Sequence, residues 1–227
     1  MKYNLNNIND IHALLIMGGV FVVIIGVAEI LKRKLKVKSE YSRKFIHIAI
    51  GMVCVLAPFR IMNHWYVLTL TGIFILFLFN DRKVKYISSL QVNRKSHGDI
   101  LLPITIYLNY LLFRYYGFHP VFYLPLLILS ISDPAAYFGG ELFNKSKKSL
   151  PGSISFFITA LIATWILFSI CNLQPASHKI LLTLSCAVLG TLVESISLKG
   201  WDNITLPITL GVILIIYFEY IAQYGIN

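Results

Sequence analysis

Eight long apolar runs, separated by short polar connections, constrain this 227-residue chain more than any other feature. A helix needs roughly 20 apolar residues to cross the ~30 Å hydrocarbon core of a bilayer. The runs lie near residues 11–31, 45–59, 63–80, 99–116, 120–138, 153–172, 179–198 and 203–222. They predict an all-α fold: a polytopic transmembrane helix bundle of about eight spans that forms a single integral membrane domain over residues 1–227.

The composition excludes a soluble globular domain. Hydrophobic residues make up 57% of the chain and charged residues only 13%, whereas about a quarter of the residues of a soluble domain are charged. The formal net charge of +10 is explained first by topology signals at the membrane face. The expected partner is therefore a lipid bilayer, and no nucleic acid is expected.

The basic residues alternate between connections in a way that predicts the orientation. The first, third, fifth and seventh connections hold sixteen of the 20 Lys and Arg residues. Cytoplasmic loops of membrane proteins carry such an excess, so we expect both termini on the outer side. Eight of the ten acidic residues also fall at or near the cytoplasmic ends of spans, which the topology rule does not require. This clustering predicts a polar site on the cytoplasmic face.

The start of the second run carries the first candidate segment. Arg43, His47 and Gly51 are spaced four residues apart and share one helical face. The planar guanidinium of Arg43 suits phosphate oxygens, and Lys44 adds a point charge. The alternative is that these are ordinary topology signals with an interfacial histidine.

The fifth run is interrupted by Ser132, Asp133 and Pro134. An aspartate inside an apolar run indicates function by default, and the following proline disfavours helical geometry at Asp133. We therefore expect the helix to break there, leaving a carboxylate and backbone carbonyls as ligands for Mg²⁺. The alternative is a structural helix break with a hydrogen-bonded aspartate.

A basic turn precedes the sixth run. Lys147 and Lys148 lie just upstream of a predicted helix N-terminus, whose N–H groups and dipole favour anions. Gly152 would allow a phosphate to approach, and Ser149 or Ser153 could cap the helix or donate to phosphate. The segment lacks the order of a Walker loop, and a basic turn without a ligand is equally compatible with it.

The end of the seventh run and the start of the eighth carry further acids. Glu194 lies within the seventh run, one turn from its polar end, and Asp202 and Asn203 begin the eighth. These carboxylates could complete a metal site. The alternative is helix capping by Asp202 or Asn203 together with a glutamate that reaches toward the membrane surface.

Together, the four segments resemble the CTP-dependent lipid-alcohol kinases, the family of dolichol kinase, phytol kinase and the CTP-using diacylglycerol kinase. The resemblance runs from about residue 40 to 210. Two positions differ from many members: Pro151, where a glutamate or small residue is common, and Ser132, where glycine often precedes the aspartate. The motifs that carry it are Arg43-Lys44-x-x-His47-x-x-x-Gly51, Ser132-Asp133-Pro134-x-Ala136-x-x-Gly139-Gly140, Lys148-Ser149-x-x-Gly152-Ser153 and Glu194-Ser195 followed by Asp202-Asn203-x-Thr205-x-Pro207.

The resemblance implies transfer of the γ-phosphoryl group of CTP, with Mg²⁺, to the hydroxyl of an isoprenoid alcohol or diacylglycerol. The catalytic residues that it implies are Asp133, Asp202 and Lys148, and the metal ligands are Asp133, Glu194 and Asp202. The nucleotide-binding residues that it implies are Arg43, Lys44, His47, Gly139, Gly140, Lys147, Lys148, Ser149, Gly152, Ser153 and Asn203. All four segments should then meet in one pocket on the cytoplasmic face.

Two alternative functions stay open. A phosphatidate cytidylyltransferase also joins CTP to a lipid at a membrane carboxylate site, but it forms a CDP-lipid and pyrophosphate. A small-solute transporter is the other alternative, because Asp133-Pro134 resembles the discontinuous helix of a transporter.

Overall fold

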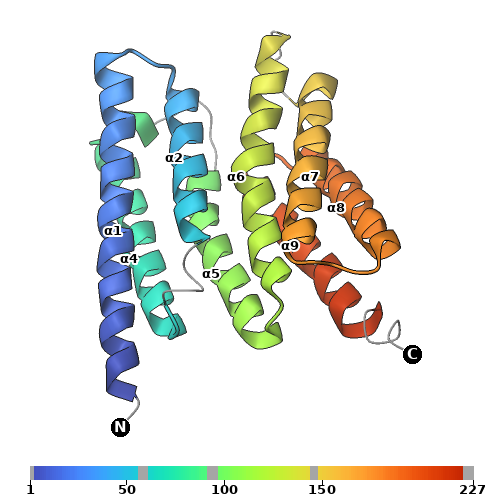
Figure 1. Ribbon diagram of the computed structural model, residues 1–227. Coiled ribbons are helices and arrows are strands. Elements are labelled where there is room, and N and C mark those ends of the chain that lie inside the picture. Colours follow the sequence, from blue (N-terminus) through green and yellow to red (C-terminus); the bar gives the residue numbers. More distant parts are fainter. Residues whose placement is uncertain (1–2, 56–60, 91–96, 144–147, 222–227) are drawn as a thin grey trace. The chain divides into compact units, whose positions relative to one another are not determined.

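The computed structural model describes residues 3–55, 61–90, 97–143 and 148–221, and all regular structure in these ranges is helical (Figure 1). The chain divides into two compact units, Met1–Tyr107 and Leu108–Asn227, which are taken separately below. The helices are α1 (Tyr3–Lys34), α2 (Ser39–Cys54), α4 (His64–Val84), the 3₁₀-helix η1 (Ser88–Leu90), α5 (Gly98–Tyr116), α6 (His119–Leu142), α7 (Leu150–Ile170), α8 (Ala176–Ile196), α9 (Asp202–Ile216) and the π-helix η2 (Tyr217–Ile221).

The described part of each of the eight apolar runs overlaps a helix, and the described regular structure is all helical, so the predicted all-α fold is confirmed. Within the described residues, five helical stretches are long and apolar enough to cross a membrane: α1, α6, α7, α8 and α9 together with η2. The helix α2 has only 16 residues, because it begins at Ser39, ahead of the second apolar run, and ends at Cys54. The count of eight spans and the outward position of the termini stay predictions.

In the first unit, a buried carboxylate on α1 fixes the start of α4. Asp10 is 1% exposed and accepts hydrogen bonds from the backbone N–H groups of Met62, at 3.0 Å, and Asn63, at 2.8 Å. The side chain of Asn63 in turn accepts from the N–H of Trp65 and caps α4. The burial of Asp10 is therefore structural, because its carboxylate satisfies backbone donors that a helix start leaves without intrahelical partners.

The other end of α1 binds the segment around η1 in the same way. The Glu29 carboxylate accepts from the N–H and hydroxyl of Ser88, at 3.1 and 2.9 Å, and from the N–H of Ser89, at 2.8 Å. Arg33 pairs with Glu29 and donates to the carbonyl of Tyr86 at 3.0 Å. Glu29, one of the acids assigned to the predicted cytoplasmic side, thus holds a connection in place.

In the second unit, α6 packs against α7 and α9, and α8 packs against α7 and α9. Two glycines set the closest approach of α6 and α7. A Cβ atom at Gly152 would lie 2.8 Å from the backbone oxygen of Ala136, and one at Gly139 would overlap the side chain of Ser155. Small residues at such crossings allow helix backbones to approach closely in membranes.

The expected break at Asp133 is wrong, because α6 continues without interruption from His119 to Leu142 and contains both Pro125 and Pro134. A proline removes the hydrogen bond from its own nitrogen to the carbonyl four residues earlier, here that of Ser130, and its ring crowds that carbonyl, but the other hydrogen bonds of the helix can remain. Unwinding the helix in apolar surroundings would leave more backbone groups without partners, and neighbouring helices make a proline tolerable. The continuous helix also removes the reason for considering a transporter.

Candidate active site

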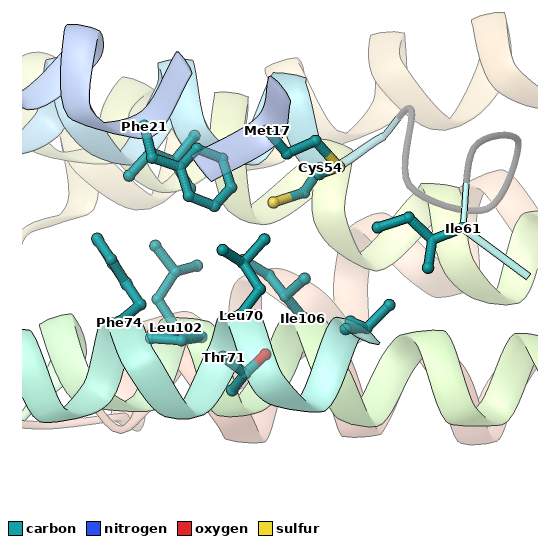
Figure 2. Close-up of a pocket in the computed structure, with 12 residues that line it drawn as sticks. Met17, Phe21, Cys54, Ile61, Leu70, Thr71, Phe74, Leu102 and Ile106 are labelled. Carbon is teal, nitrogen blue, oxygen red and sulfur yellow. The ribbon is translucent and has the colours of Figure 1, made fainter. Parts of the chain in front are cut away.

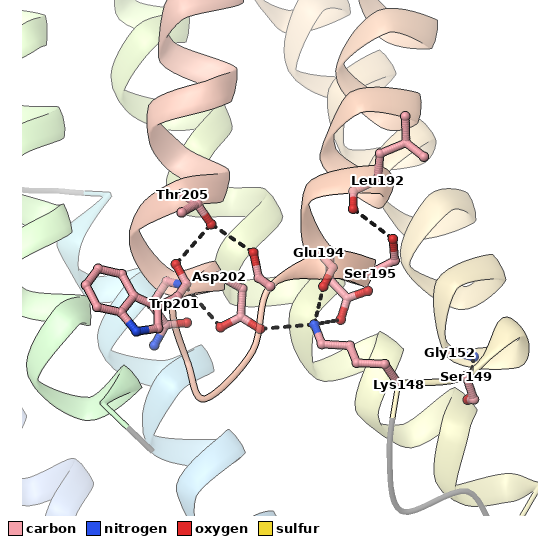
Figure 3. Close-up of polar contacts among 11 residues, drawn as sticks. Lys148, Ser149, Gly152, Leu192, Glu194, Ser195, Trp201, Asp202 and Thr205 are labelled. Carbon is pink, nitrogen blue, oxygen red and sulfur yellow. Dashed lines mark hydrogen bonds and ion pairs between the residues drawn. The ribbon is translucent and has the colours of Figure 1, made fainter. Parts of the chain in front are cut away.

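A three-way contact around Lys148 brings the ends of three helices together in the second unit (Figure 3). The ammonium group of Lys148 pairs with the Oε1 atom of Glu194, donates to the backbone carbonyl of the same residue, and lies 3.1 Å from the Oδ2 atom of Asp202. Glu194 is 4% and Asp202 9% exposed. Lys148 therefore places a positive charge between two buried carboxylates.

Local structure explains why these three residues meet. Lys148 precedes Ser149, whose hydroxyl accepts from the N–H of Gly152 and caps α7. Glu194 occupies the last turn of α8, and Asp202 is the first residue of α9. The connection from α8 to α9 is short, so a carboxylate from each helix end reaches the residue that precedes α7 (Figure 3).

The turn between α8 and α9 is fixed by its own polar contacts. The hydroxyls of Ser197 and Thr205 lie 3.0 Å apart, and Thr205 also donates to the carbonyl of Trp201 at 3.0 Å. The backbone at Lys199 and Gly200 has φ values of 55° and 87°, a left-handed conformation that allows the sharp reversal. These contacts hold Asp202 at the start of α9.

The environment of Lys148 keeps its ammonium group charged. Burial alone lowers the pKa of Lys148, but the carboxylates of Asp202 and Glu194 raise it more, so that its pKa lies above the usual 10.5. A neighbouring opposite charge favours the charged form. The site therefore presents a permanent cation at neutral pH.

Asp133 adds a third carboxylate to the same unit. Asp133 lies on α6 and is 8% exposed, and Glu194 interacts electrostatically with both Asp133 and Asp202. The hydroxyl of the adjacent Ser132 is buried without a hydrogen-bond partner. A buried hydroxyl without a partner carries a free-energy cost.

The glycines predicted to bind the nucleotide pack helices instead of lining an open loop. Gly139 and Gly152 both lie at the α6–α7 crossing, and Gly140 is buried. Ser153 donates its N–H to the carbonyl of Ser149 at 2.9 Å, as part of the first turn of α7. A nucleotide-binding role for these residues stays a prediction.

Asn203 and Lys147 are the other predicted nucleotide-binding residues of the second unit, and the structure describes only the first of them. Asn203 is 3% exposed, and its N–H donates to the Oδ1 atom of Asp202 at 3.1 Å. Asn203 therefore helps to orient that carboxylate. Lys147 lies outside the described residues.

The basic candidates of α2 belong to the first unit. Arg43 donates from Nε and Nη2 to the Oε2 atom of Glu40, at 3.0 and 2.9 Å, a pairing that the three-residue spacing could have predicted. Lys44 and His47 are buried, at 4% and 6% exposure. Their predicted meeting with the carboxylates of the second unit stays a prediction.

The described residues offer some, but not all, of the ligands that a bound metal ion needs. Within the described residues, no three or more His, Cys, Asp or Glu side chains form a group that could hold a metal. Mg²⁺ that arrives with a nucleotide needs only one or two carboxylates, because water and phosphate oxygens supply the other ligands. Glu194 and Asp202, which both contact Lys148, meet that smaller requirement, and Asp133 as a metal ligand stays a prediction.

Comparison with known proteins identifies a family whose profile covers most of these residues. The profile of the cytidylyltransferase family matches residues 9–199, a range that contains Arg43, Asp133, Lys148 and Glu194 and ends just before Asp202. That family includes CTP-dependent lipid kinases and enzymes of CDP-alcohol type. No curated protein and no solved structure matches the chain significantly. Because the profile covers most of the 227 residues, the chain belongs to the cytidylyltransferase family.

Proposed function

We propose that this protein is a membrane-embedded kinase that transfers the γ-phosphoryl group of CTP to the hydroxyl of a lipid alcohol. Family membership and the five long apolar helices support a membrane enzyme that uses CTP. The observation that carries the proposal is the Lys148 contact with Glu194 and Asp202. It combines a fixed cation with buried carboxylates at helix ends, which are the two kinds of group that a phosphoryl-transfer site requires.

The cation has a clear role in this proposal. Lys148 lies two residues before Leu150, the first residue of α7, whose backbone N–H groups also favour anions. Negative charge is spread over the phosphate oxygens during transfer, so a charge that is already in position lowers the barrier. Lys148 would then exchange one carboxylate partner for a phosphate oxygen when the nucleotide binds.

The carboxylates supply proton transfer in the same scheme. The hydroxyl oxygen of the lipid forms a bond to the γ-phosphorus as the bond from that phosphorus to the bridging oxygen breaks, and CDP leaves. The hydroxyl proton passes to a carboxylate, for which Asp133 is the first candidate and Asp202 the second. A carboxylate positioned beside the reacting hydroxyl can accept its proton in the transition state.

One or two of the carboxylates of Asp133, Glu194 and Asp202 would hold Mg²⁺ that arrives with the nucleotide. When bound, the ion would neutralise charge on the β- and γ-phosphates and help to position them. Lys148 then completes the neutralisation from the protein side.

A CDP-lipid synthase is the second candidate, because cytidylyl transfer is the activity for which the family is named. Such an enzyme would use the same carboxylates and the same cation. In that reaction a lipid phosphate oxygen attacks the α-phosphorus of CTP and pyrophosphate leaves. The products therefore separate the two candidates: a lipid phosphate with CDP, or a CDP-lipid with pyrophosphate.

Replacement of Asp133 by asparagine tests the proposal. In purified protein reconstituted in nanodiscs, we expect Asp133→Asn to reduce the formation of lipid phosphate at least about 100-fold, the loss typical when a proton acceptor is removed. Glu219→Gln is the matched control, because Glu219 lies in η2, at the other end of the helical stretch that Asp202 begins. Full activity of Asp133→Asn would remove Asp133 from the mechanism.

A further inference from the structure

The turn that joins α1 to α2 carries a dense group of basic residues. Five of the seven residues from 32 to 38 are Lys or Arg, and Lys32, Arg33 and Lys34 form the last turn of α1. The candidate span Asn9–Lys34 has 26 residues, which is about 39 Å at ~1.5 Å per residue, whereas the hydrocarbon core of a bilayer is ~30 Å thick. When this stretch crosses a membrane, its last turn therefore lies at the level of the lipid headgroups.

A second basic turn lies beside the first one. The Nη2 atom of Arg33 donates to the backbone carbonyl of Tyr86 at 3.0 Å, and the Glu29 carboxylate accepts from the N–H groups of two serines of η1. Lys85 is the C-terminal cap of α4 and directly precedes Tyr86. The lysines of the two turns, called the lysine cluster below, are Lys32, Lys34, Lys36 and Lys85.

The lysine cluster keeps its positive charge, because the nearby carboxylates pair with arginines instead. These pairs are Arg33 with Glu29, Arg43 with Glu40 and Arg82 with Asp99. Within the described residues, none of the four lysines forms an ion pair with a carboxylate. Lys34, Lys36 and Lys85 are exposed. An anion from outside the chain can therefore approach them without displacing a carboxylate.

Exposed apolar side chains stand next to these lysines. Leu35 lies between Lys34 and Lys36 in the chain, Tyr86 follows Lys85, and each of the two is 66% exposed. In a bilayer, acyl chains begin directly below the headgroups, so a lipid places negative charge and apolar surface side by side. The lysine cluster and its two apolar neighbours match both parts of such a lipid.

The first unit offers the acyl chains a path outside but no room inside. The apolar cavity between α1, α2, α4 and α5, where Phe21 and Leu102 are among the lining residues (Figure 2), has a volume of only about 30 Å³. That is room for roughly one or two water molecules and not for a hydrocarbon chain. On the outside of α1, Val23, Ile30 and Lys34 are seven and four residues apart and share one exposed face. This face is apolar along its length and ends in a lysine.

We infer that the lysine cluster binds an anionic phospholipid, with the headgroup phosphate at the lysines and the acyl chains along this face of α1. Clusters of about four to eight basic residues directly beside a membrane span are typical of such recognition. A topology signal needs only the number of Lys and Arg in a connection, whereas lipid binding also needs the apolar path that leads to Lys34. A free phosphate or nucleotide has no chain to place there, and the headgroup cation of a zwitterionic lipid opposes the lysines.

The lipid preference of the purified protein tests the inference. Native mass spectrometry in detergent measures the dissociation constants of single lipids, here phosphatidylglycerol and phosphatidylcholine with identical acyl chains. We expect the unaltered protein to bind phosphatidylglycerol at least about fivefold more tightly, the contribution of one lysine at a membrane surface. In Lys34→Gln combined with Lys85→Gln, which removes one lysine from each turn, the preference should fall to within about twofold. Equal affinities for the two lipids in the unaltered protein, or an unchanged preference in this variant, would overturn the inference.

Two matched variants separate the lysine cluster from positive charge in general. Lys34→Arg combined with Lys85→Arg keeps both charges and should keep the preference for phosphatidylglycerol. Arg114→Gln combined with Lys199→Gln removes two charges at exposed positions outside the cluster and should keep it too. An equal loss of preference in this last variant, or displacement of bound phosphatidylglycerol by CTP, would contradict the assignment of this lipid to the cluster. Because no turnover is measured, these outcomes do not depend on the proposed function.

Discussion

Lys148 is the residue on which the candidate site depends most, because a single ammonium group holds carboxylates from two helices. The variant Lys148→Met replaces the lysine with a side chain of similar length that carries no charge. We expect its turnover of CTP to fall about 100-fold, the loss typical when one donor to a developing negative charge is removed. Steady-state assays in nanodiscs measure this. Lys83→Met, an exchange at an exposed position of α4, should leave turnover unchanged, and an equal loss in both variants would contradict the role of Lys148.

The same contact contributes to stability in a pH-dependent way. The pKa of Lys148 is raised in the folded protein, so its contribution is fully present below the unfolded value of about 10.5 and is lost as the pH rises through the folded value. We therefore expect Lys148→Met to lower the free energy of unfolding by about 1 to 3 kcal/mol at neutral pH, because buried carboxylates lose their partner. Unfolding in detergent at increasing pH should show this difference shrink only above about pH 10.5. A difference that disappears near neutral pH would be evidence against the ion pair.

The sequence predicted a charged site from its residue types, which stays a prediction, and it did not predict that Lys148 pairs with Glu194 and Asp202. The residue types of Asp133, Lys148, Glu194 and Asp202 indicated a charged site, because charge inside or beside a membrane span is costly. That Lys148 contacts both Glu194 and Asp202 depends on where three helix ends meet, which residue spacing along the chain does not determine. Gly139 and Gly152 were predicted to bind the nucleotide, but in the structure they allow α6 and α7 to pack closely. A glycine in a motif can therefore have a packing role that the motif does not reveal.

Among the elements, the crossing of α6 and α7 tolerates no side chain at Gly152. A Cβ atom there would lie 2.8 Å from the backbone oxygen of Ala136, and a backbone atom cannot rotate away. We expect Gly152→Ala to lower the free energy of unfolding by about 1 to 3 kcal/mol, as overpacking does. In the control Gly72→Ala, where nothing lies within 4 Å of the new atom, the higher helix propensity of alanine should leave stability equal or raise it slightly. Equal behaviour of both variants in thermal unfolding would contradict the close crossing.

The junction of α1 and α4 depends on one carboxylate. Replacing Asp10 by alanine leaves the partly buried N–H groups of Met62 and Asn63 without their acceptor, and the loss of a hydrogen bond of this kind costs about 1 kcal/mol. We expect Asp10→Ala to lower the unfolding temperature while CTP turnover of the folded fraction is preserved. Asn9→Ala, at an exposed position on the same helix, should change neither quantity. Normal stability of Asp10→Ala would show that these bonds contribute little.

Hydrophobic patterning predicted where helices occur but not how each one continues or ends. The run at 120–138 lies within a continuous α6, although Asp133-Pro134 favoured a break. Packing against α7 and α9 outweighs the preference of a residue before proline for an extended backbone. The start of α2 at Ser39 was also missed, since its first turn is polar and lies outside the apolar run.

For the whole molecule, the distribution of Lys and Arg predicts that the turn between α8 and α9 faces the cytoplasm. In a variant without native cysteines, a cysteine introduced at Lys199 should react with a membrane-impermeant maleimide in inside-out vesicles but not in intact cells. A cysteine introduced at Lys179, in the first turn of α8, should show the opposite pattern. Labelling of both from the same side would contradict the predicted orientation.

The fate of the γ-phosphorus of CTP tests the central claim most directly. Purified protein in nanodiscs that contain both geranylgeraniol, an isoprenoid alcohol, and phosphatidate, the acceptor of a CDP-lipid synthase, is given Mg²⁺ and CTP labelled at the γ-phosphate, and the lipid and aqueous products are separated. The account predicts that the label moves to the lipid as a monophosphate and that CDP accumulates in equal amount. Label recovered in pyrophosphate, together with an unlabelled CDP-lipid, would contradict it.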